Sequence, residues 1–493
     1  MENNLFITSK HSKYSEYLPI WEKCKDCVEG EEAIKGVNKY RYLPMLPGQK
    51  NDTKYGQSLY EFYIEYAEFY NATGRTVDGM KGLVFRKNPT YQLNEKMIEM
   101  TKNIDLRGQT LEGFAKKIFD EVTIKNRVGI LVDYPVNNNY ELTVQQAEEK
   151  NLRPYCTIYN AESIYNWMEG NINNVWKTSR VSLYEYEYEI DPETNYNIKI
   201  DILRLLELDE EGYYNQKVYK RKNKLNQNGI SIGNDDKMNT SSGYLLEETL
   251  YPLMNGKKMD FIPFIPLTGF GITWDLRKPV INDLANVNIK HYRNSANLEN
   301  GLQLTGNPTA CLAGIILDDG AGKTIKLGSS VVHQFKENGK WGFLEFSGAG
   351  LGMIREEMKS KEERMVLLGG KILTNDKKVG ESAEAMRINR SGENGVLSDI
   401  ALSVEEGINK ALSIMAQWEG ITDNQEIKLN MDFNASGLSA NELNALVGAW
   451  QKGNLSGKEL FEIEKKAELI SERKTWEDHV AEIEQEGPAL GAI

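Results

Sequence analysis

The chain is poor in the residues from which metal sites and nucleophilic sites are built. Its 493 residues include four Cys and four His, scattered over the whole length. Cys24 and Cys27 have the spacing of half a zinc site, but a structural site needs a second close pair of ligands, and the sequence has none. Trp21, Cys24 and Val28 recur at helical spacing, which favours two thiols on one amphipathic helix. Few cysteines without a paired pattern indicate a reducing compartment, and we expect neither a metal nor a cofactor.

The sequence also lacks an excess of positive charge and a long apolar run. Its 59 Lys and Arg stand against 72 Asp and Glu, a net charge of −13, whereas proteins that coat nucleic acid need clustered cations. Any nucleic acid would therefore be contacted locally or merely enclosed. No stretch approaches the ~20 apolar residues of a membrane span, and the first residues lack the basic and apolar regions of a secretory signal. We expect no membrane insertion and no secretion by that route, and roughly two to four folded domains.

Catalytic motifs are incomplete. Gly320-Ala-Gly-Lys-Thr324 resembles the end of a P-loop, but Leu317 stands where the motif needs its first glycine, and strand-and-turn sequence follows instead of a helix. No His accompanies a nucleophile on a constrained turn. The pairs Asp235-Asp236 and Asp318-Asp319 lie in turn sequences and lack the third carboxylate of a two-metal nuclease. We therefore predict that the protein is not an enzyme.

The first ~120 residues have the periodicity of helices. Between Tyr55 and Tyr70, apolar residues recur at intervals of three and four along one stripe, namely Leu59, Phe62, Tyr63, Tyr66, Phe69 and Tyr70. Such a stripe could stack on nucleic-acid bases. A continuous stripe at helical spacing is more typical of a buried core, and we predict a core.

The pattern becomes that of β-strands from about Arg153 to Pro266. Residues 181–190 alternate with period two, which predicts one face on a core and Glu185, Glu187 and Glu189 toward water. Similar runs follow at 198–208, 213–219 and 244–250. Strands in this region between helical flanks predict an α+β fold.

Helices return after Pro279, which suits a first helical turn and opens a predicted helix to about Leu304. Residues 309–346 have short alternating runs separated by glycines, so we predict a small β insert. After the insert, apolar residues recur at intervals of three and four and form a narrow row, or seam, along one side of a predicted helix. Such a seam predicts packing against near-parallel helices of the same or a neighbouring subunit. The seam consists of Leu351, Ile354, Met358, Met365, Leu368 and Ile372, with Lys361 as the one polar member of the row.

A series of short motifs runs in order from about Trp21 to Gly420. They are Arg41-Tyr-Leu-Pro44, Tyr70-Asn-Ala-Thr73, Val77-Asp-Gly-Met-Lys-Gly-Leu-Val-Phe-Arg-Lys87, Val128-Gly-Ile-Leu-Val-Asp-Tyr-Pro135, Arg153-Pro-Tyr155, Phe261-Ile-Pro-Phe-Ile-Pro266, Leu284-Ala-Asn-Val-Asn-Ile-Lys-His-Tyr-Arg293, Gly306-Asn-Pro-Thr309, Glu345-Phe-Ser-Gly-Ala-Gly350 and Leu367-Leu-Gly-Gly-Lys-Ile-Leu373. Each is short, but their colinear order resembles a branch of tailed-bacteriophage portal proteins long catalogued only as a domain of unknown function.

This resemblance implies a division of the chain into named parts. They are a mixed α/β wing (residues 1–277, helical first and β-rich from about 153), a stem helix (278–305), a small β-containing clip (306–349), a second stem helix (350–373), a tunnel loop (374–380), a long helix with a return strand of the wing (381–434) and a helical crown (435–493).

Portal proteins form a ring, usually a dodecamer, at one capsid vertex. The resemblance implies that double-stranded DNA passes through the channel without sequence recognition. It also implies docking of the terminase and of head–tail adaptor or connector proteins, and contact with the major capsid protein or scaffold. Assembly would take place in the cytoplasm of the bacterial host, and the product would be part of the virion, with no membrane involved.

The same resemblance assigns two small sites. In the tunnel loop, Asn375, Lys377 and Lys378 would face DNA. Lysines repeated around a ring could contact phosphates without reading sequence, or they could simply be solvated. In the clip, Asp318 and Asp319 would contribute to docking of a partner protein.

Two other interpretations remain open. A different head or neck protein, such as a connector or a scaffold-binding component, would share an oligomeric seam but not the order of stem, clip and stem. A packaging ATPase or nuclease would require an intact P-loop with a Walker B acid, or a carboxylate triad. The sequence supplies neither of these.

Overall fold

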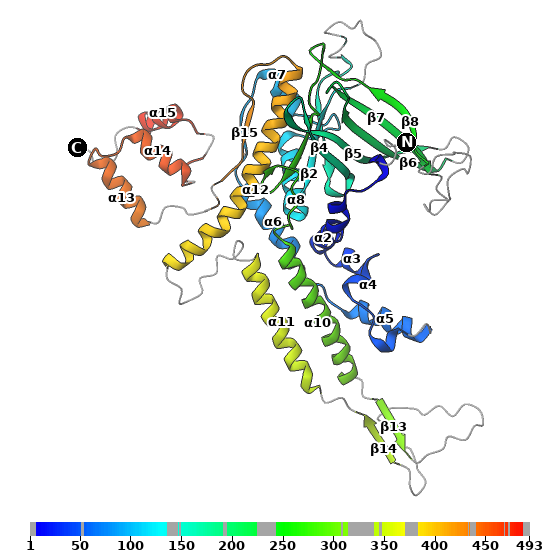
Figure 1. Ribbon diagram of the computed structural model, residues 1–493. Helices are drawn as coiled ribbons and strands as arrows, with labels where there is room; N and C mark the ends of the chain where they lie inside the picture. Colours follow the sequence, from blue (N-terminus) through cyan, green and yellow to red (C-terminus); the bar gives the residue numbers. More distant parts are fainter. Residues whose placement is uncertain are drawn as a thin grey trace. The chain divides into compact units, whose positions relative to one another are not determined.

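The fold was analysed on a computed structural model, which describes residues 6–50, 54–135, 146, 149–190, 195–223, 243–306, 309–313, 340–344, 348–369, 383–431, 433, 440–467, 469–471 and 474–486. The chain divides into two compact units, Met1–Leu429 and Asn430–Ile493. Helices and antiparallel sheets alternate in blocks along the first unit, and the second is helical where described (Figure 1). The α+β class predicted from the sequence is confirmed.

Short helices build the N-terminal part of the first unit. They are α2 (Ser12–Glu29), α3 (Glu31–Lys35), α4 (Lys39–Tyr42), α5 (Lys54–Tyr66), α6 (Ala72–Val84), α7 (Glu95–Thr101) and α8 (Leu111–Lys125). Polar residues set their ends: Asn71 Oδ1 accepts a hydrogen bond from Gly74 N at 2.8 Å, and Thr110 Oγ1 accepts one from Gly113 N at 3.2 Å. Asn126 adopts a left-handed conformation (φ 54°) and ends α8.

A small sheet forms the centre of the first unit. Its strands are β2 (Val128–Asp133), β3 (Tyr155–Asn160), β11 (Phe264–Thr268) and β12 (Gly271–Ile272), in the order β12-β11-β2-β3 and antiparallel throughout. Every residue of β2 is buried, because α8 and α12 (Ala383–Trp418) pack against this sheet. A Cβ on Gly129 would overlap the Phe264 ring, so glycine allows the aromatic ring to lie directly over the strand.

A second, larger sheet follows the order β4-β5-β6-β7-β8. The strands are β4 (Ile164–Ile172), β5 (Val175–Ile190), β6 (Asn197–Leu208), β7 (Tyr214–Asn223) and β8 (Leu245–Leu250), all antiparallel to their neighbours. A short hairpin, β9 (Leu253–Met254) with β10 (Lys257–Lys258), follows.

The prediction that the glutamates of β5 face water is wrong for Glu185. This side chain is partly buried, where its Oε1 accepts hydrogen bonds from Arg204 Nε and Tyr159 Oη, each at 2.6 Å. Tyr186 and Tyr188 are each 58% exposed instead. Arg204 on the neighbouring strand accounts for the position of Glu185, because burying a paired carboxylate costs much less than burying an unpaired one.

An aromatic cage encloses a charged side chain beside the small sheet. Arg127 is 3% exposed, and its guanidinium carbon lies 4.0 Å from the Trp167 ring centre, 5.5 Å from that of Trp21 and 5.9 Å from that of Trp274. Neither of its Nη atoms has a hydrogen-bond partner among the described residues. Burial lowers the pKa of Arg127 to about 9. We call these four residues the Arg127 cage.

The remainder of the first unit is a long helical segment with one β-hairpin. Its elements are α10 (Asn282–Gly306), β13 (Thr309–Ala313), β14 (Lys340–Leu344), α11 (Ala349–Leu368), α12 and β15 (Glu426–Lys428), the last pairing with β1 (Thr90–Gln92). One side of α12 is buried against α8 and the small sheet, through Ile400, Val404, Ile408, Leu412 and Met415.

The second unit contains α13 (Ala440–Gln451), α14 (Gly457–Lys466) and α15 (Trp476–Glu486). A capping box starts α14: Ser456 N donates to Glu459 Oε2 at 2.8 Å, and Glu459 N donates to Ser456 Oγ at 3.2 Å. Phe461, 1% exposed, contacts the rings of Trp476 and His479, which holds α14 to α15.

Candidate assembly site at the α10–α11 helix pair

Helices α10 and α11 lie side by side and run antiparallel (Figure 1). Gly301 near the end of α10 meets Leu351 at the start of α11, and Gly369 after α11 lies near Leu284 in the first turn of α10. At 1.5 Å per residue, the 25 residues of α10 extend ~37 Å. Strands β13 and β14 pair antiparallel between the two helices, from Thr309 opposite Leu344 to Ala313 opposite Lys340. The segment is thus helix, hairpin, helix.

The predicted seam largely coincides with the covered side of α11. Met365 is 2% exposed, and Leu351, Ile354 and Met358 are half-buried. Lys361 of the same row is buried, and its Nζ donates to Glu357 Oε1 at 2.6 Å, so the charge is paired at the edge of the seam.

The last two seam positions differ. Leu368 is 48% exposed, because Gly369 rather than Leu368 meets Thr76 and Leu284 at that end of the helix. Within the chain Leu368 therefore lies outside the covered side of α11, and its place in a seam with a neighbouring subunit stays a prediction. Ile372 lies outside the described residues.

Polar side chains attach α10 to its neighbours. His291 is 4% exposed, and its Nε2 lies 3.1 Å from Glu362 Oε1 of α11. Asn288 Oδ1 accepts a hydrogen bond from Thr73 Oγ1 at 2.9 Å, and Asn288 Nδ2 donates to the Tyr70 carbonyl at 2.8 Å. Buried hydrogen bonds of this kind fix one arrangement of helices more strictly than apolar contact alone.

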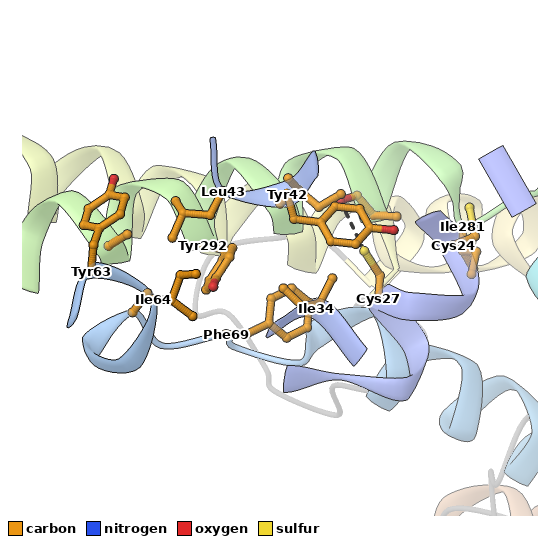
Figure 2. Close-up of a cluster of buried hydrophobic side chains, with 14 of the residues drawn as sticks. Cys24, Cys27, Ile34, Tyr42, Leu43, Tyr63, Ile64, Phe69, Ile281 and Tyr292 are labelled. Atoms are coloured by element: carbon orange, nitrogen blue, oxygen red, sulfur yellow. Dashed lines mark hydrogen bonds between the residues drawn. The ribbon is translucent and has the colours of Figure 1, made fainter. Parts of the chain in front are cut away.

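An apolar core holds the other side of α10 (Figure 2). It lies in the layer between α10 and the N-terminal helices and includes Cys24, Cys27, Ile34, Tyr42, Leu43, Tyr60, Tyr63, Ile64, Phe69, Ile281 and Tyr292. Both cysteines lie on α2, as the helical spacing predicts. Burial raises the pKa of the Cys24 thiol to about 12 and raises that of Cys27 as well. Both are therefore neutral packing groups.

The aromatic stripe of residues 55–70 is only half core, so the prediction of a continuous core is wrong. Tyr63 and Phe69 are each 5% exposed, but Leu59, Phe62, Tyr66 and Tyr70 are 37%, 55%, 50% and 43% exposed. The stripe is wider than the surface that α10 can cover, so its outer half stays in solvent. We call Leu59, Phe62, Tyr66 and Tyr70 the aromatic patch.

The two sites that the resemblance assigned are not among the described residues. Asn375, Lys377 and Lys378 of the tunnel loop, and Asp318 and Asp319 of the clip, all lie outside them.

A basic pocket was not foreseen from the sequence. A cavity of about 430 Å³ is lined by Lys23, Arg41, Tyr42, Asn286, Ile289, Lys290 and Arg293. The helix α10 supplies four of these residues, α2 one and α4 two. The spacing of Lys290 and Arg293 places two cations on one side of a helix, but nothing local links them to Lys23 or Arg41, roughly 250 residues earlier.

Two negative findings apply to the described ranges. They contain no group of three or more His, Cys, Asp or Glu side chains placed to hold a metal ion. None of their helices combines the length and the apolar character needed to cross a bilayer.

Comparison with known proteins gives one family match. A family described as "Domain of unknown function (DUF4055)" matches residues 280–419. This segment runs from the residues just before α10 to the residue after α12, and it therefore contains the whole helix, hairpin, helix arrangement. No curated protein matches the chain.

The chain is also similar to parts of two solved assemblies. One is "Neck of native GTA particle computed with C12 symmetry", with 10% sequence identity and a TM-score of 0.35, covering 78% of this chain and 86% of that chain. The other is "Virion of native gene transfer agent (GTA) particle", with 10% identity and a TM-score of 0.35, covering 81% of this chain and 89% of that chain.

Proposed function

We propose that the chain is the subunit of a portal-type ring at a capsid vertex, through which double-stranded DNA enters and leaves a virion. The observation that carries the proposal is the antiparallel pair of α10 and α11 with a β-hairpin between them, followed by the long helix α12. This order agrees with the stem, clip, stem and long helix that the resemblance to portal proteins implies. In a ring, each copy would contribute one such pair to the wall of a central passage.

The charges on α11 suit a wall past which DNA slides. The exposed side of this helix carries Arg355, Glu356, Lys359 and Glu363, so cations and anions are interspersed along it. A continuous row of cations would release counterions along the whole duplex and hold it in place. Mixed charges in water give no such row, and a duplex would stay mobile.

The aromatic patch suits a contact between neighbouring copies. It combines four large apolar side chains, each more than a third exposed, next to the core that anchors α10. Exposed apolar surface of this kind is typical of protein interfaces. In a closed ring, such a patch on one copy would be covered by a different surface of the next copy, since ring contacts join unlike faces.

The sites outside the described residues belong to the same proposal. Lys377 and Lys378 would contact backbone phosphates from the tunnel loop, and Asp318 and Asp319 would dock the terminase or an adaptor. Replacing both lysines by Ala should leave ring assembly intact and change the length or retention of packaged DNA. Reversing both aspartate charges should weaken partner docking in a pull-down.

Electron microscopy of the purified chain tests the central claim. Class averages viewed down the symmetry axis should show a hollow ring, and light scattering should give a mass several times that of one chain. A single compact subunit at high protein concentration, without any hollow assembly, would refute the proposal. Absence of ATP hydrolysis by the same preparation would separate it from a packaging motor.

A further inference from the structure

We propose that the basic pocket is a binding site for an oxyanion of the phosphate class. Helices α2, α4 and α10 surround the cavity, and four of its seven lining residues are cations, namely Lys23, Arg41, Lys290 and Arg293. None of the seven is acidic. Such a concentration of positive charge stands out in a chain whose net charge is −13. The inference concerns this cavity alone and does not depend on ring assembly.

Neutral groups, rather than carboxylates, hold two of the cations. Lys23 Nζ donates to Asn282 Oδ1 at 2.8 Å and to Asn286 Oδ1 at 2.6 Å. Arg293 donates from Nε to the Tyr42 carbonyl at 2.7 Å and from Nη2 to the Arg41 carbonyl at 3.2 Å. These bonds orient the side chains but leave their charges unneutralised.

The remaining charges near the cavity do not cancel the excess. Arg41 pairs with Glu22, with Nη1 at 2.8 Å from Oε2. Lys290 has no ion-pair partner among the described residues. Asp26 and Asp283 also lie near, hydrogen-bonded to neutral donors, the first to Tyr42 Oη and Asn38 Nδ2 and the second to Asn282 Nδ2. Together with Glu22 they set three carboxylates against the four cations of the pocket, so one positive charge remains in excess.

The half-buried position of Lys23 favours an anion. Burial is the main cause that lowers the pKa of Lys23, and Arg41 adds to it, against a smaller opposing effect of Asp283, because a partly desolvated ammonium that is not paired directly with a carboxylate is unfavourable. An anion bound in the cavity would offset that cost. The geometry therefore makes charge compensation by a ligand more effective here than at a solvated surface lysine.

Phosphate is the anion that the donor set fits. A guanidinium has five N–H donors in a planar fork that matches phosphate oxygens, and the two bonds made by Arg293 leave donors for a ligand. Lysine ammonium groups add point charges to the same group. Tyr42 and Ile289 give the cavity an apolar wall, and about 430 Å³ holds more than a bare anion. A backbone phosphate of DNA or a free phosphate compound would present the same chemistry.

Two matched double variants test the site. Lys290→Gln with Arg293→Gln removes two cations that are exposed at the edge of the pocket, and thermal melting checks that the fold survives loss of the Arg293 hydrogen bonds to α4. As a control, Lys102→Gln with Arg107→Gln removes one lysine and one arginine charge from exposed positions between α7 and α8, away from the pocket and from α11. The full-length protein is titrated with inorganic phosphate by calorimetry and with a short fluorescein-labelled DNA duplex by anisotropy at several salt concentrations.

Phosphate should bind the wild-type chain and the control variant alike, and the pocket variant should bind it at least about tenfold more weakly, since charge-assisted hydrogen bonds are lost. Weaker duplex binding with a shallower salt dependence in the pocket variant alone would identify DNA as the source. Phosphate binding without duplex binding would identify a free phosphate compound. The proposal is overturned if wild-type protein binds neither probe, if both variants bind equally, or if poly-glutamate binds in the pocket while phosphate does not.

Discussion

Replacing Arg127 by Met should stabilise the protein, although the substitution removes a side chain enclosed by three tryptophans. Two opposing effects decide the outcome. Burial lowers the pKa of Arg127 from the ordinary value of a guanidinium to about 9, and each pKa unit corresponds to ~1.4 kcal/mol, so the buried charge costs on the order of 5 kcal/mol. One close cation–π contact and two longer ones return roughly 2 to 4 kcal/mol. Met is similar in length and carries no charge to desolvate.

The net expectation for Arg127→Met is a gain of ~1 to 3 kcal/mol in the free energy of unfolding. The neighbouring Lys125 provides the matched control, because it is equally buried but paired, with its Nζ 3.0 Å from Glu121 Oε2 and 2.8 Å from Glu162 Oε2. Lys125→Met leaves two carboxylates without their cation and should cost about 3 kcal/mol. Urea unfolding followed by tryptophan fluorescence measures both changes.

The pH dependence of the Arg127 effect has a definite sign. The pKa of Arg127 is lower in the folded than in the unfolded chain, so the unfolded state binds more protons from about pH 9 up to the ordinary pKa of a guanidinium. Wild-type stability should therefore rise with pH in that window relative to Arg127→Met, and the advantage of the variant should shrink from pH ~8 to ~10. A variant less stable than wild type at pH ~8 would refute the reasoning, because it would mean that the cage or an unseen partner outweighs desolvation.

Three further outcomes are expected. Gly129→Ala should lower the free energy of unfolding in urea by about 1 to 3 kcal/mol, because the new methyl group overlaps the Phe264 ring, and adding Phe264→Leu should recover part of the loss. If the losses of the two single variants simply added in the double variant, the overlap would not be the cause. Met365→Ala should cost about 2 to 4 kcal/mol as a buried seam residue, and a cost below ~1 kcal/mol would show that α10 and α11 separate easily. Phe62→Glu in the aromatic patch should reduce assembly seen by light scattering without lowering Tm, whereas Ile98→Glu, also exposed, should not; equal effects of the two would remove the patch from the interface.

Features that depend on local periodicity could be predicted from the sequence. The helices α10 and α11 and the β-hairpin between them lie where Pro279, the seam at residues 351–365 and the glycine-separated runs place them. Each of these signals resides in a few consecutive turns or strands. No knowledge of the neighbouring elements is needed to detect it.

Features that depend on partners distant in the chain could not be predicted. A helical stripe does not show how much of it a second helix will cover, so Phe62 and Tyr63 could not be told apart as exposed and buried. The side of Glu185 is decided by Arg204 on the next strand. The basic pocket joins Lys23 with Lys290, which only tertiary packing brings together.

The way α10 is fastened has a mechanical consequence. Among the described residues, its last hydrogen bond to the N-terminal helices is that from Tyr63 Oη to Asn297 Oδ1 at 2.7 Å, and the helix continues for nine more residues, the last of which is Gly306. Along that stretch, ~13 Å long, its close neighbour is α11, which it meets at the glycine–leucine contact of Gly301 and Leu351. Rotation of the Leu351 side chain is enough to loosen its packing against Gly301. The hydrogen bonds at residues 288 to 297 must instead break before that part of α10 can separate from the N-terminal helices. The helix pair is therefore held by hydrogen bonds at the end near the N-terminal helices, whereas packing of Leu351 against Gly301 joins the two helices at the end near the hairpin.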